Sequence, residues 1–332
     1  MDVLSDVLRA VRMTGAFFFS ATNYSPWVCG EPTVGDIAQR IMPEADFVIP
    51  FHVITYGGCW VDLVGEEPTT IRLEAGDIIV LPKGDAHFMM SENGLRKTIS
   101  PAEFDPPPGR RNALRYIVNG EKGGRVDCRF VCGFMGGAAR PFNPLLGALP
   151  RMFSARTSPA NREWLSTLAQ AGVAESERDS AGAETVLAKL AELMFVEVVR
   201  QHIEEMPPDS RRWLAGLRDR HIGAALQLIQ EQPREAWTLE SLAQRVALSR
   251  SVFAERFTNF VGVPAIQYLA RWRLTVAAQL LEDKNVSIEQ AGTEVGYESE
   301  AAFNRAFKKY VGTAPGAWRK GRRLDVAAAA AE

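Results

Sequence analysis

The sequence of 332 residues contains no run of eighteen apolar residues, and it has no basic region followed by a long apolar stretch near its start. The patch Phe17-Phe18-Phe19 is too short for a membrane span or for the core of a signal peptide. These absences argue against a membrane protein. We therefore expect a soluble, cytoplasmic protein with no membrane partner.

Cysteine is scarce as well. The chain holds only four, Cys29, Cys59, Cys128 and Cys132, and a long chain in a reducing compartment does not use so few as a disulfide framework. Three uses stay open from the sequence: small apolar packing residues, metal ligands, or redox-sensing thiols.

The net charge of -2 is small, but the charges are unevenly distributed. Residues 211–323 contain 18 Lys and Arg against 11 Asp and Glu, whereas the remaining residues contain 20 basic against 29 acidic side chains. A basic block that follows an acidic one is typical of a polyanion-binding module joined to a part with another task.

The spacing of the apolar residues changes near residue 161. Short β-branched and aromatic stretches, separated by Gly, Pro and Asp, fill residues 46–135 and predict a sandwich or barrel. Residues 183–206 carry instead one wide apolar stripe at helical spacing, which ends at Pro207-Pro208. We therefore expect strands in the first half and helices in the second.

One helix-turn-helix pattern occurs twice in the basic block, over residues 239–257 and 288–307. In each copy a short amphipathic helix is followed by a turn and by a Ser that can cap a second helix. That second helix has two Phe residues four apart on one face, Phe253 and Phe257 in the first copy and Phe303 and Phe307 in the second. Two such helices on one rigid body can enter two successive major grooves. The repeat predicts a regulator of transcription.

Residues 222–319 closely resemble the AraC/XylS family of bacterial transcription regulators. The residues that carry the resemblance are Leu242-Ala243, Leu248-Ser249-Arg250, Phe257, Gly262, Tyr268-Leu269, Arg273-Leu274, Ala277, Val295-Gly296-Tyr297 and the stretch from Phe303 to Arg319. The resemblance implies a DNA-binding domain in which the solvent face of each second helix enters the groove.

By this resemblance, eight residues are the candidates for reading base edges: Arg250, Ser251, Ala254, Glu255, Glu300, Ala301, Asn304 and Arg305. An Arg such as Arg305 can make a bidentate contact to guanine, and an Asn such as Asn304 can pair with adenine. Ala254 is small where family members often carry a long side chain, so DNA shape or phosphate contacts are expected to contribute more at the first helix. The candidates for phosphate contacts are Arg256, Arg271, Lys308 and Lys309.

A different pattern lies between Gly76 and His87, where five residues separate Gly76 from Pro82 and Gly84 precedes His87 by three positions. The glycines and the proline shape a turn that points the histidine into the mouth of a barrel. The pattern resembles the second motif of the cupin barrels, and the front half is similar to the cupin-type sensor domain found ahead of many AraC-like regulators. The first cupin motif is incomplete, because His52 stands alone and no His-x-His occurs. A complete catalytic iron site is therefore not expected.

A reduced metal site is one remaining use of this barrel. Imidazole and thiolate together suit zinc, and the candidate ligands are His52, His87, Cys128 and Cys132. The two cysteines are four apart and face the same side of a strand about 13 Å from each other, so both sulfurs reach one ion only through a bulge. The alternatives are histidines satisfied by hydrogen bonds in a plain core, or an organic effector. The candidate lining of an effector pocket is Phe51, Tyr56, Trp60, Phe88 and Met89.

Together these patterns predict an α+β multidomain protein. Its expected parts are a cupin-like β-barrel over 1–160, a helical connector with a candidate dimerisation helix over 161–210, an all-α domain with two helix-turn-helix motifs over 211–323, and a flexible tail over 324–332. We expect a homodimeric regulator, not an enzyme, that binds double-stranded promoter DNA, works with RNA polymerase and senses a small molecule, a metal or an oxidant. Two alternatives stay open: residual metal-dependent enzymatic activity of the barrel, and a ligand-free barrel that serves only dimerisation.

Overall fold

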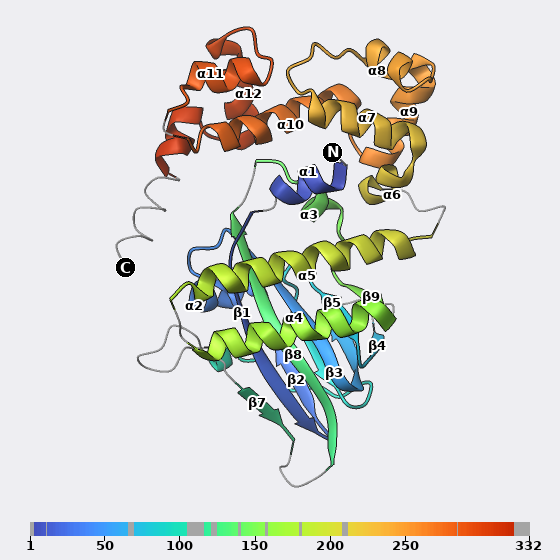
Figure 1. Ribbon diagram of the computed structural model, residues 1–332, viewed down its shortest axis with the longest axis vertical. Coiled ribbons are helices and arrows are strands. Elements are labelled where there is room, and N and C mark those ends of the chain that lie inside the picture. Colours follow the sequence, from blue (N-terminus) through green and yellow to red (C-terminus); the bar gives the residue numbers. More distant parts are fainter. Residues whose placement is uncertain are drawn as a thin grey trace. The chain divides into compact units, whose positions relative to one another are not determined.

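The computed structural model describes residues 3–10, 12–65, 70–104, 116–120, 125–138, 141–156, 159–178, 181–207, 212–283 and 285–321. The chain divides into two compact units (Figure 1). The barrel unit consists of residues 12–138 and 149–205, and the helical unit consists of residues 1–11, 139–148 and 206–332. Each unit is therefore built from segments that are not contiguous in the sequence.

The barrel unit is a nearly closed β-barrel, formed in the described residues by one sheet with the strand order β2-β6-β3-β8-β1-β7. Strands β4 and β5 also pair with β3, and β9 pairs with β5. The strands are β1 (Arg12–Tyr24), β2 (Val28–Glu31), β3 (Phe47–Leu63), β4 (Ile71–Glu74), β5 (Asp77–Val80), β6 (His87–Met90), β7 (Tyr116–Asn119), β8 (Val126–Ala138) and β9 (Phe153–Arg156). A helix, α2 (Val34–Ile41), and a 3-10 turn, η1 (Pro101–Phe104), complete the barrel wall.

Alternation along the strands decides what lies inside the barrel. On β3, Ile54, Cys59, Val61 and Leu63 belong to the interior core with Met89 of β6 and Phe130 of β8. Neighbouring residues on a strand point to opposite faces. The outer face of β1 and β3 is apolar too, because Phe18 and Phe51 pack edge to face with ring centroids 5.2 Å apart. This sheet therefore needs a second cover on its outside.

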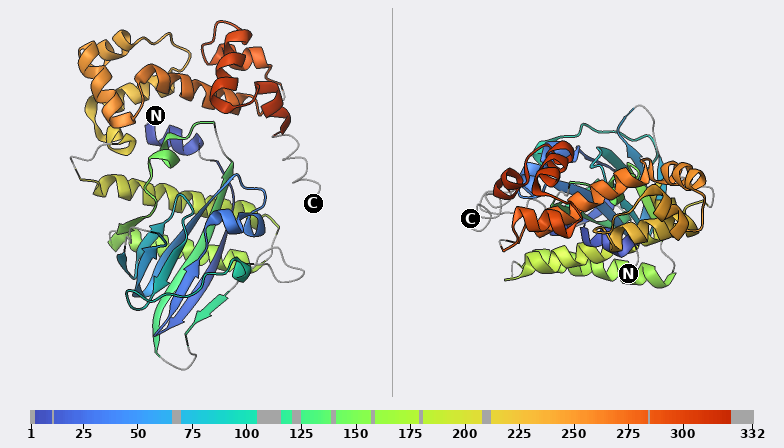
Figure 2. Two further views of the ribbon diagram at one scale, coloured as in Figure 1. Left: turned by 180° about the vertical axis from the view of Figure 1, so that it is seen from behind. Right: turned by 90° about the horizontal axis from the view of Figure 1, so that it is seen from above.

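Two long helices, α4 (Pro159–Arg178) and α5 (Ala183–Glu205), supply that cover and run side by side across the outside of the sheet (Figures 1 and 2). Gly172 on α4 allows close approach, since a Cβ atom there would lie 2.7 Å from the ring of Phe18. The buried face of α5 includes Leu187, Ala191 and Val198. The helix expected over 183–206 is present, and its apolar stripe packs mainly against strand β1 of its own barrel.

The helical unit contains α6 (Trp213–Arg218), α7 (Arg220–Glu231), α8 (Leu239–Arg245), α9 (Arg250–Val261), α10 (Ala265–Leu280), α11 (Ile288–Glu294) and α12 (Glu300–Val311). Local sequence fixes the ends of these helices. Thr238 with Ser241, and Ser287 with Gln290, form capping boxes at the starts of α8 and α11. Gly262, with φ +79°, and Gly312, with φ +89°, end the two helices that follow, in the left-handed conformation that favours glycine.

Two further helices belong to the helical unit although they are distant in sequence from the rest of it. Helix α1 (Val3–Ala10) contacts α7, and α3 (Pro144–Ala148) contacts both α6 and α1. The observed division thus differs from the expected boundaries: the front end of the chain and residues 139–148 join the helical unit, while residues 161–205 join the barrel unit. Among the described residues, no helix is long and apolar enough to cross a membrane.

Candidate functional site

The first helix-turn-helix consists of α8, a turn and α9. The hydroxyl of Ser249 accepts a hydrogen bond from the backbone N–H of Val252, which starts α9 at the expected cap. Phe253 and Phe257 are fully buried and hold one face of α9 to the unit. The opposite face exposes Arg250, Ser251 and Glu255. Ala254 is half-buried beside them.

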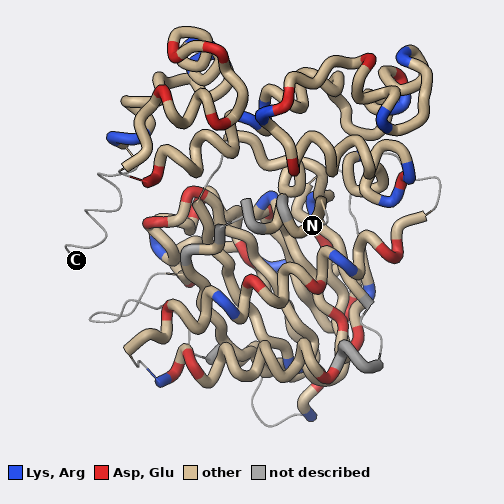
Figure 3. The backbone as a smooth tube through the Cα atoms, turned by 45° about the horizontal axis from the view of Figure 1, so that its top comes forward, with Lys and Arg blue, Asp and Glu red and all other residues tan. Residues whose placement is uncertain are grey.

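The second helix-turn-helix, α11 and α12, repeats this arrangement. Ser299 accepts from the N–H of Ala302, and Phe303 and Phe307 are fully buried. The residues left exposed are Glu300, Ala301 and Arg305. Asn304 is half-buried, and its amide donates a hydrogen bond of 3.3 Å to Glu300 on the preceding turn. Each second helix thus offers a short exposed face with both charges, and Figure 3 shows acidic residues interspersed with basic ones along the helical unit.

The four candidates for phosphate contacts have different surroundings. Lys308 and Lys309 are exposed on α12. The guanidinium of Arg271 lies 5.5 Å from the centroid of the Phe142 ring. Arg256 forms an ion pair with Asp219, whose side chain also caps α7 by accepting from the N–H groups of His221 and Ile222. Burial raises the pKa of Asp219, but these hydrogen bonds outweigh it and hold the pKa below its usual value.

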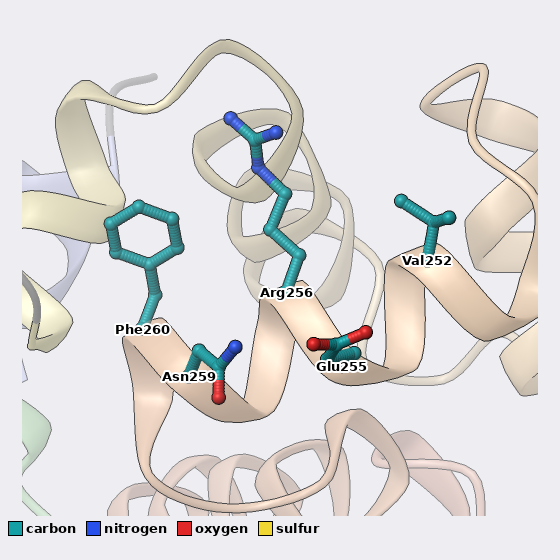
Figure 4. Close-up of a pocket in the computed structure, with 5 residues that line it drawn as sticks. All are labelled: Val252, Glu255, Arg256, Asn259 and Phe260. Atoms are coloured by element: carbon teal, nitrogen blue, oxygen red, sulfur yellow. The ribbon is translucent and has the colours of Figure 1, made fainter.

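Arg256 therefore has a structural partner within the protein. Together with Val252, Glu255, Asn259 and Phe260 it lines a pocket of about 330 Å³ on one side of α9 (Figure 4). Its guanidinium points from α9 toward neighbouring helices in this view, whereas Glu255 lies lower on the same pocket wall. Lys308 and Lys309 carry their charges on the exposed surface of α12, where the ammonium group of Lys309 lies 5.6 Å from the ring centroid of its neighbour Tyr310.

A second cluster of polar side chains lies inside the barrel. Glu31 ends β2 and pairs in register with His87, the first residue of β6. His52, near the middle of β3, pairs with Cys132 of β8. The Nε2 atoms of the two histidines are 2.8 Å apart, and the Glu31 carboxylate oxygens lie 3.8 Å from His52 Nε2 and 3.6 Å from His87 Nε2. One donor atom from each of the three residues falls within 4.8 Å of the others.

The outer nitrogen of each histidine ring has its own partner. His52 Nδ1 lies 2.6 Å from the sulfur of Cys132, and His87 Nδ1 lies 3.1 Å from the backbone oxygen of Asp85. The turn before His87 depends on Gly84, which has φ +65° and whose added Cβ would lie 2.5 Å from the side chain of Val34. A carbonyl that accepts from one imidazole nitrogen orients the other nitrogen, which is how ligand histidines are commonly held. Both Nε2 atoms therefore face the carboxylate.

Burial dominates the electrostatics of this cluster. All three side chains are at most 4% exposed. Burial raises the pKa of Glu31 to about 8 and lowers that of His87 to about 4. Burial, followed by repulsion from His87, lowers the pKa of His52 well below its usual value. In addition, within the part of the chain that the structure describes, no group forms a hydrogen bond with the buried Oε2 atom of Glu31. The site thus brings together three side chains whose neutral forms are favoured by burial, and one of them, Glu31, has an oxygen that accepts no hydrogen bond from the described residues.

This donor set fits a divalent transition metal. Two imidazoles and one carboxylate are a ligand combination of zinc and of non-haem iron(II). A cation would supply the partner that the orphaned Glu31 oxygen lacks and would favour the ionised carboxylate. Glu31, His52 and His87 could hold such an ion directly, with Cys132 and Asp85 behind the two rings.

The structure brings together part of the metal site expected from sequence and adds a residue to it. His52, His87 and Cys132 meet as expected. Cys128 lies instead beside Cys59, and their hydrogen bond, together with burial, raises the pKa of Cys59 well above its usual value. Between the two cysteines β8 keeps a continuous register with β1, and the irregularity in its pairing with β3 adds a residue to β3 and not to β8, so the cysteines stay separated as the strand spacing requires. Glu31 was missed, since only the pairing of β2 with β6 brings it to His87.

The expected effector lining does not converge on the interior. Met89 is in the barrel core. Phe51 and Phe88 directly neighbour His52 and His87 on their strands and so point to the opposite face. Tyr56 is 44% exposed, with Arg129 5.7 Å from its ring centroid, and Trp60 lies beside Arg72 at 5.5 Å. Strand alternation places the aromatic neighbours of an inward-facing histidine on the outer face of the barrel, contrary to the expected lining.

The surroundings of the half-buried Cys29 and the buried Cys132 favour the protonated thiol. Burial raises the pKa of Cys29 to about 12 and that of Cys132 well above its usual value. The thiolate is the reactive form of cysteine. The surroundings of these two thiols therefore disfavour oxidation at neutral pH.

Comparisons with known proteins agree with both halves of this description. A family model described as "Cupin" matches residues 2–204, and a model described as "Helix-turn-helix domain" matches residues 242–321. The HTH-type transcriptional regulator AlkR of Acinetobacter baylyi is 32% identical over 329 residues, which cover 96% of this chain and 99% of AlkR. A putative AraC-like transcription regulator of Streptomyces lividans is 30% identical over 324 residues, which cover 96% and 98% of the two chains.

Among solved structures, the DNA-binding domain of AdpA in complex with a target DNA has 28% sequence identity and a TM-score of 0.31. It aligns with 32% of this chain and 95% of that domain. A barrel of the cupin type joined to two helix-turn-helix motifs defines a DNA-binding transcription regulator. The chain belongs to the AraC-type regulators with an N-terminal cupin domain, and it is a regulator and not an enzyme.

Proposed function

We propose that this regulator senses a divalent first-row transition metal, zinc foremost, through Glu31, His52 and His87, and that occupancy of this site changes its affinity for promoter DNA. The observation that carries the proposal is the buried, partnerless Oε2 atom of Glu31 beside two Nε2 atoms that are themselves only 2.8 Å apart. Burial of ionisable groups without compensation is unfavourable, so a barrel that served only dimerisation would gain stability from apolar residues here.

The metal would supply positive charge at this point of the barrel interior. The protein itself orients the two ligand rings. The backbone oxygen of Asp85 contacts His87 Nδ1, and the sulfur of Cys132 contacts His52 Nδ1. Glu31 releases its proton when the cation binds, because a ligand carboxylate must be ionised. The local change on binding is therefore the replacement of a neutral acid by a carboxylate held between two histidines.

DNA is proposed to bind along the exposed faces of α9 and α12. Arg305 is the candidate for a bidentate contact to guanine, and Glu255 and Glu300 can accept from cytosine. Lys308 and Lys309 are the candidates for phosphate contacts. The remaining partners in this proposal are RNA polymerase and a second copy of the chain. The exposed apolar residues Val186 and Leu193 on α5 support pairing with that second copy.

Metal content tests the sensing half of this proposal. The chain is purified without chelator and without nickel affinity resin, and its zinc, iron and manganese are measured by elemental analysis beside Glu31→Gln and His87→Ala. The exposed acid Glu92 provides a matched control, Glu92→Gln. The expected result is one equivalent of one metal in the wild type and in the control, and a loss in both site variants. Absence of metal in the wild type, also after reconstitution with zinc, would exclude a metal sensor.

A further inference from the structure

The chain leaves the barrel unit once between two of its strands. After β8 ends at Ala138, residues 139–148 belong to the helical unit, and the chain returns to the barrel unit at Leu149 before β9. We call residues 139–148 the excursion. Helix α3 lies within it and contacts α6 and α1. The barrel unit is thus connected to the helical unit through both ends of this short segment, in addition to the connections before β1 and after α5.

Phe142 fixes the excursion to α10. Its ring packs edge to face on Tyr268, with centroids 5.5 Å apart at 84°, and it lies 5.5 Å from the guanidinium of Arg271. Its carbonyl oxygen accepts a hydrogen bond of 2.9 Å from the hydroxyl of Thr275. Residues 268, 271 and 275 share one face of a helix. Any shift of Phe142 must therefore move α10 or break these contacts.

The contacts continue from α10 to α9, the second helix of the first helix-turn-helix. Tyr268 is fully buried and packs on Phe257 of α9 at 5.9 Å and 71°. Phe257 in turn packs on Phe253, 5.5 Å away on the same helix. The hydroxyl of Tyr268 accepts a 2.8 Å hydrogen bond from Gln230, which restrains the ring. These rings form a continuous packed series from the excursion to the core face of α9.

In the barrel unit, each histidine is tied to one end of the same excursion. His52 contacts Cys132 on β8, the strand that precedes the excursion in the sequence. His87 contacts the backbone oxygen of Asp85, whose carboxylate accepts two hydrogen bonds from Arg151, at 3.1 Å and 2.7 Å. Arg151 stands where the chain has just returned to the barrel unit. The outer nitrogens of the two histidines thus lead to the entry and the exit of one segment.

We propose that residues 141–148 transmit the state of the Glu31, His52 and His87 site to α10 and α9, with Phe142 and Arg151 as positioning residues. This inference rests on the proposed metal-sensing function and specifies its regulation. Strand β8 pairs with β1 on one side and with β3 on the other, so hydrogen bonds restrain it on both edges. A movement of the two rings therefore reaches α10 through covalent connections and packed side chains.

The test measures thermodynamic coupling in the full-length chain. The probes are zinc ions and a DNA duplex selected from a random pool by the wild-type protein. Zinc affinity is measured by competition with a chelating dye, and DNA affinity is measured with and without zinc. The variants are Phe142→Leu, which removes the ring, and Arg151→Gln, which removes the ion pair with Asp85 at the surface. Their controls are Trp164→Leu, an exposed aromatic on α4, and Lys189→Gln, an exposed ion-pair partner of Glu192 on α5.

In the wild type and in both controls, zinc is expected to change DNA affinity by about fivefold or more, within the usual range of allosteric coupling. In Phe142→Leu the ratio of DNA affinities with and without zinc falls toward one, while zinc affinity stays within about twofold. Arg151→Gln reduces the ratio in the same direction. A wild-type ratio retained in Phe142→Leu overturns the role of the excursion and leaves metal sensing intact. A ratio of one in the wild type overturns both proposals.

Hydrogen exchange provides a readout that does not depend on DNA. Zinc is expected to slow amide exchange in peptides from residues 87–90 and from residues 265–280 of the wild type. In Phe142→Leu the protection of 87–90 remains and the protection of 265–280 is lost. Equal protection of 265–280 in the variant and the wild type contradicts the proposed route, even where the variant binds DNA more weakly.

Discussion

His52 and His87 approach each other inside the barrel with their Nε2 atoms 2.8 Å apart, although 35 positions separate them in the chain. Each ring is held from behind, by Cys132 in one case and by the backbone of Asp85 in the other. Glu31 closes the third side. This relationship underlies the sensing proposal, and the helix-turn-helix pair underlies DNA binding.

The first prediction concerns the pH dependence of stability of the metal-free chain. The pKa of Glu31 is about 8 in the folded protein and 4.5 as its reference value, so the folded state binds this proton more tightly. Its stabilising contribution is complete below pH 4.5 and is lost as pH rises to 8. The pKa of His87 is lowered from 6.5 to about 4, so its contribution rises with pH between 4 and 6.5 and opposes that of Glu31.

Of these two groups, only Glu31 changes its contribution to the free energy of unfolding between pH 6.5 and 8. The free energy of unfolding is therefore expected to fall by up to about 2 kcal/mol over this interval. Urea unfolding in the presence of EDTA measures it, with Glu31→Gln as the comparison, because the amide does not titrate. The same decline in Glu31→Gln as in the wild type would show that another group causes it.

Arg305→Ala tests base readout by α12. Its side chain is exposed near the middle of the helix, and an arginine can make a bidentate contact to guanine. The substitution is expected to weaken binding to the selected duplex by about 1–3 kcal/mol and to leave unfolding unchanged. Binding to a shuffled duplex of the same composition should change much less. An unaltered isotherm on the selected duplex would remove Arg305 from the interface.

Lys308→Ala and Arg256→Ala separate a phosphate contact from a structural ion pair. Lys308 is exposed, whereas Arg256 pairs with Asp219 at the cap of α7. The Lys308 variant is expected to reduce the slope of log affinity against log salt by about one, at unchanged stability. The Arg256 variant is expected to keep the slope and lose at most about 1 kcal/mol of stability, because the pair is partly exposed. A loss of stability in the Lys308 variant together with a reduced salt slope in the Arg256 variant would contradict these roles.

Gly296→Ala tests how tightly the second helix-turn-helix is built. Gly296 has φ +87°, and an added Cβ would lie 2.6 Å from the backbone oxygen of Arg234 and 2.9 Å from the Arg273 guanidinium. Gly312 has φ +89° with open space around it, so Gly312→Ala carries the backbone strain alone, about 1–2 kcal/mol. The Gly296 variant is expected to lose more stability than this control in urea unfolding. Equal losses of stability in the two variants would mean that the backbone near Arg234 moves aside at no cost in free energy.

The helix-turn-helix half could be predicted in detail because its signals are local. The caps Ser249 and Ser299, the paired Phe residues and the terminal glycines all act within a few positions of one another. Residue periodicity alone then predicts which face is buried and which is exposed. The barrel and the turn before His87 could be predicted for the same reason.

The candidate metal site could be predicted only in part, because it depends on strand pairing. Glu31 becomes a neighbour of His87 through the register of β2 with β6, and no spacing in the chain indicates that pairing. Residue type alone predicts an aromatic lining at Phe51 and Phe88, whereas strand alternation with His52 and His87 places both rings on the opposite face. The membership of Phe142 in the helical unit depends on long-range packing on α10, which periodicity does not reveal.

Occupancy of the site formed by Glu31, His52 and His87 is proposed to change the affinity for DNA. The most direct measurement is the affinity of the full-length chain for its selected duplex, first stripped of metal and then with one equivalent of zinc, beside Glu31→Gln. We expect zinc to change the affinity for the duplex about fivefold or more in the wild type and to leave it unchanged in the variant. Superimposable isotherms for the wild type with and without bound zinc would contradict it.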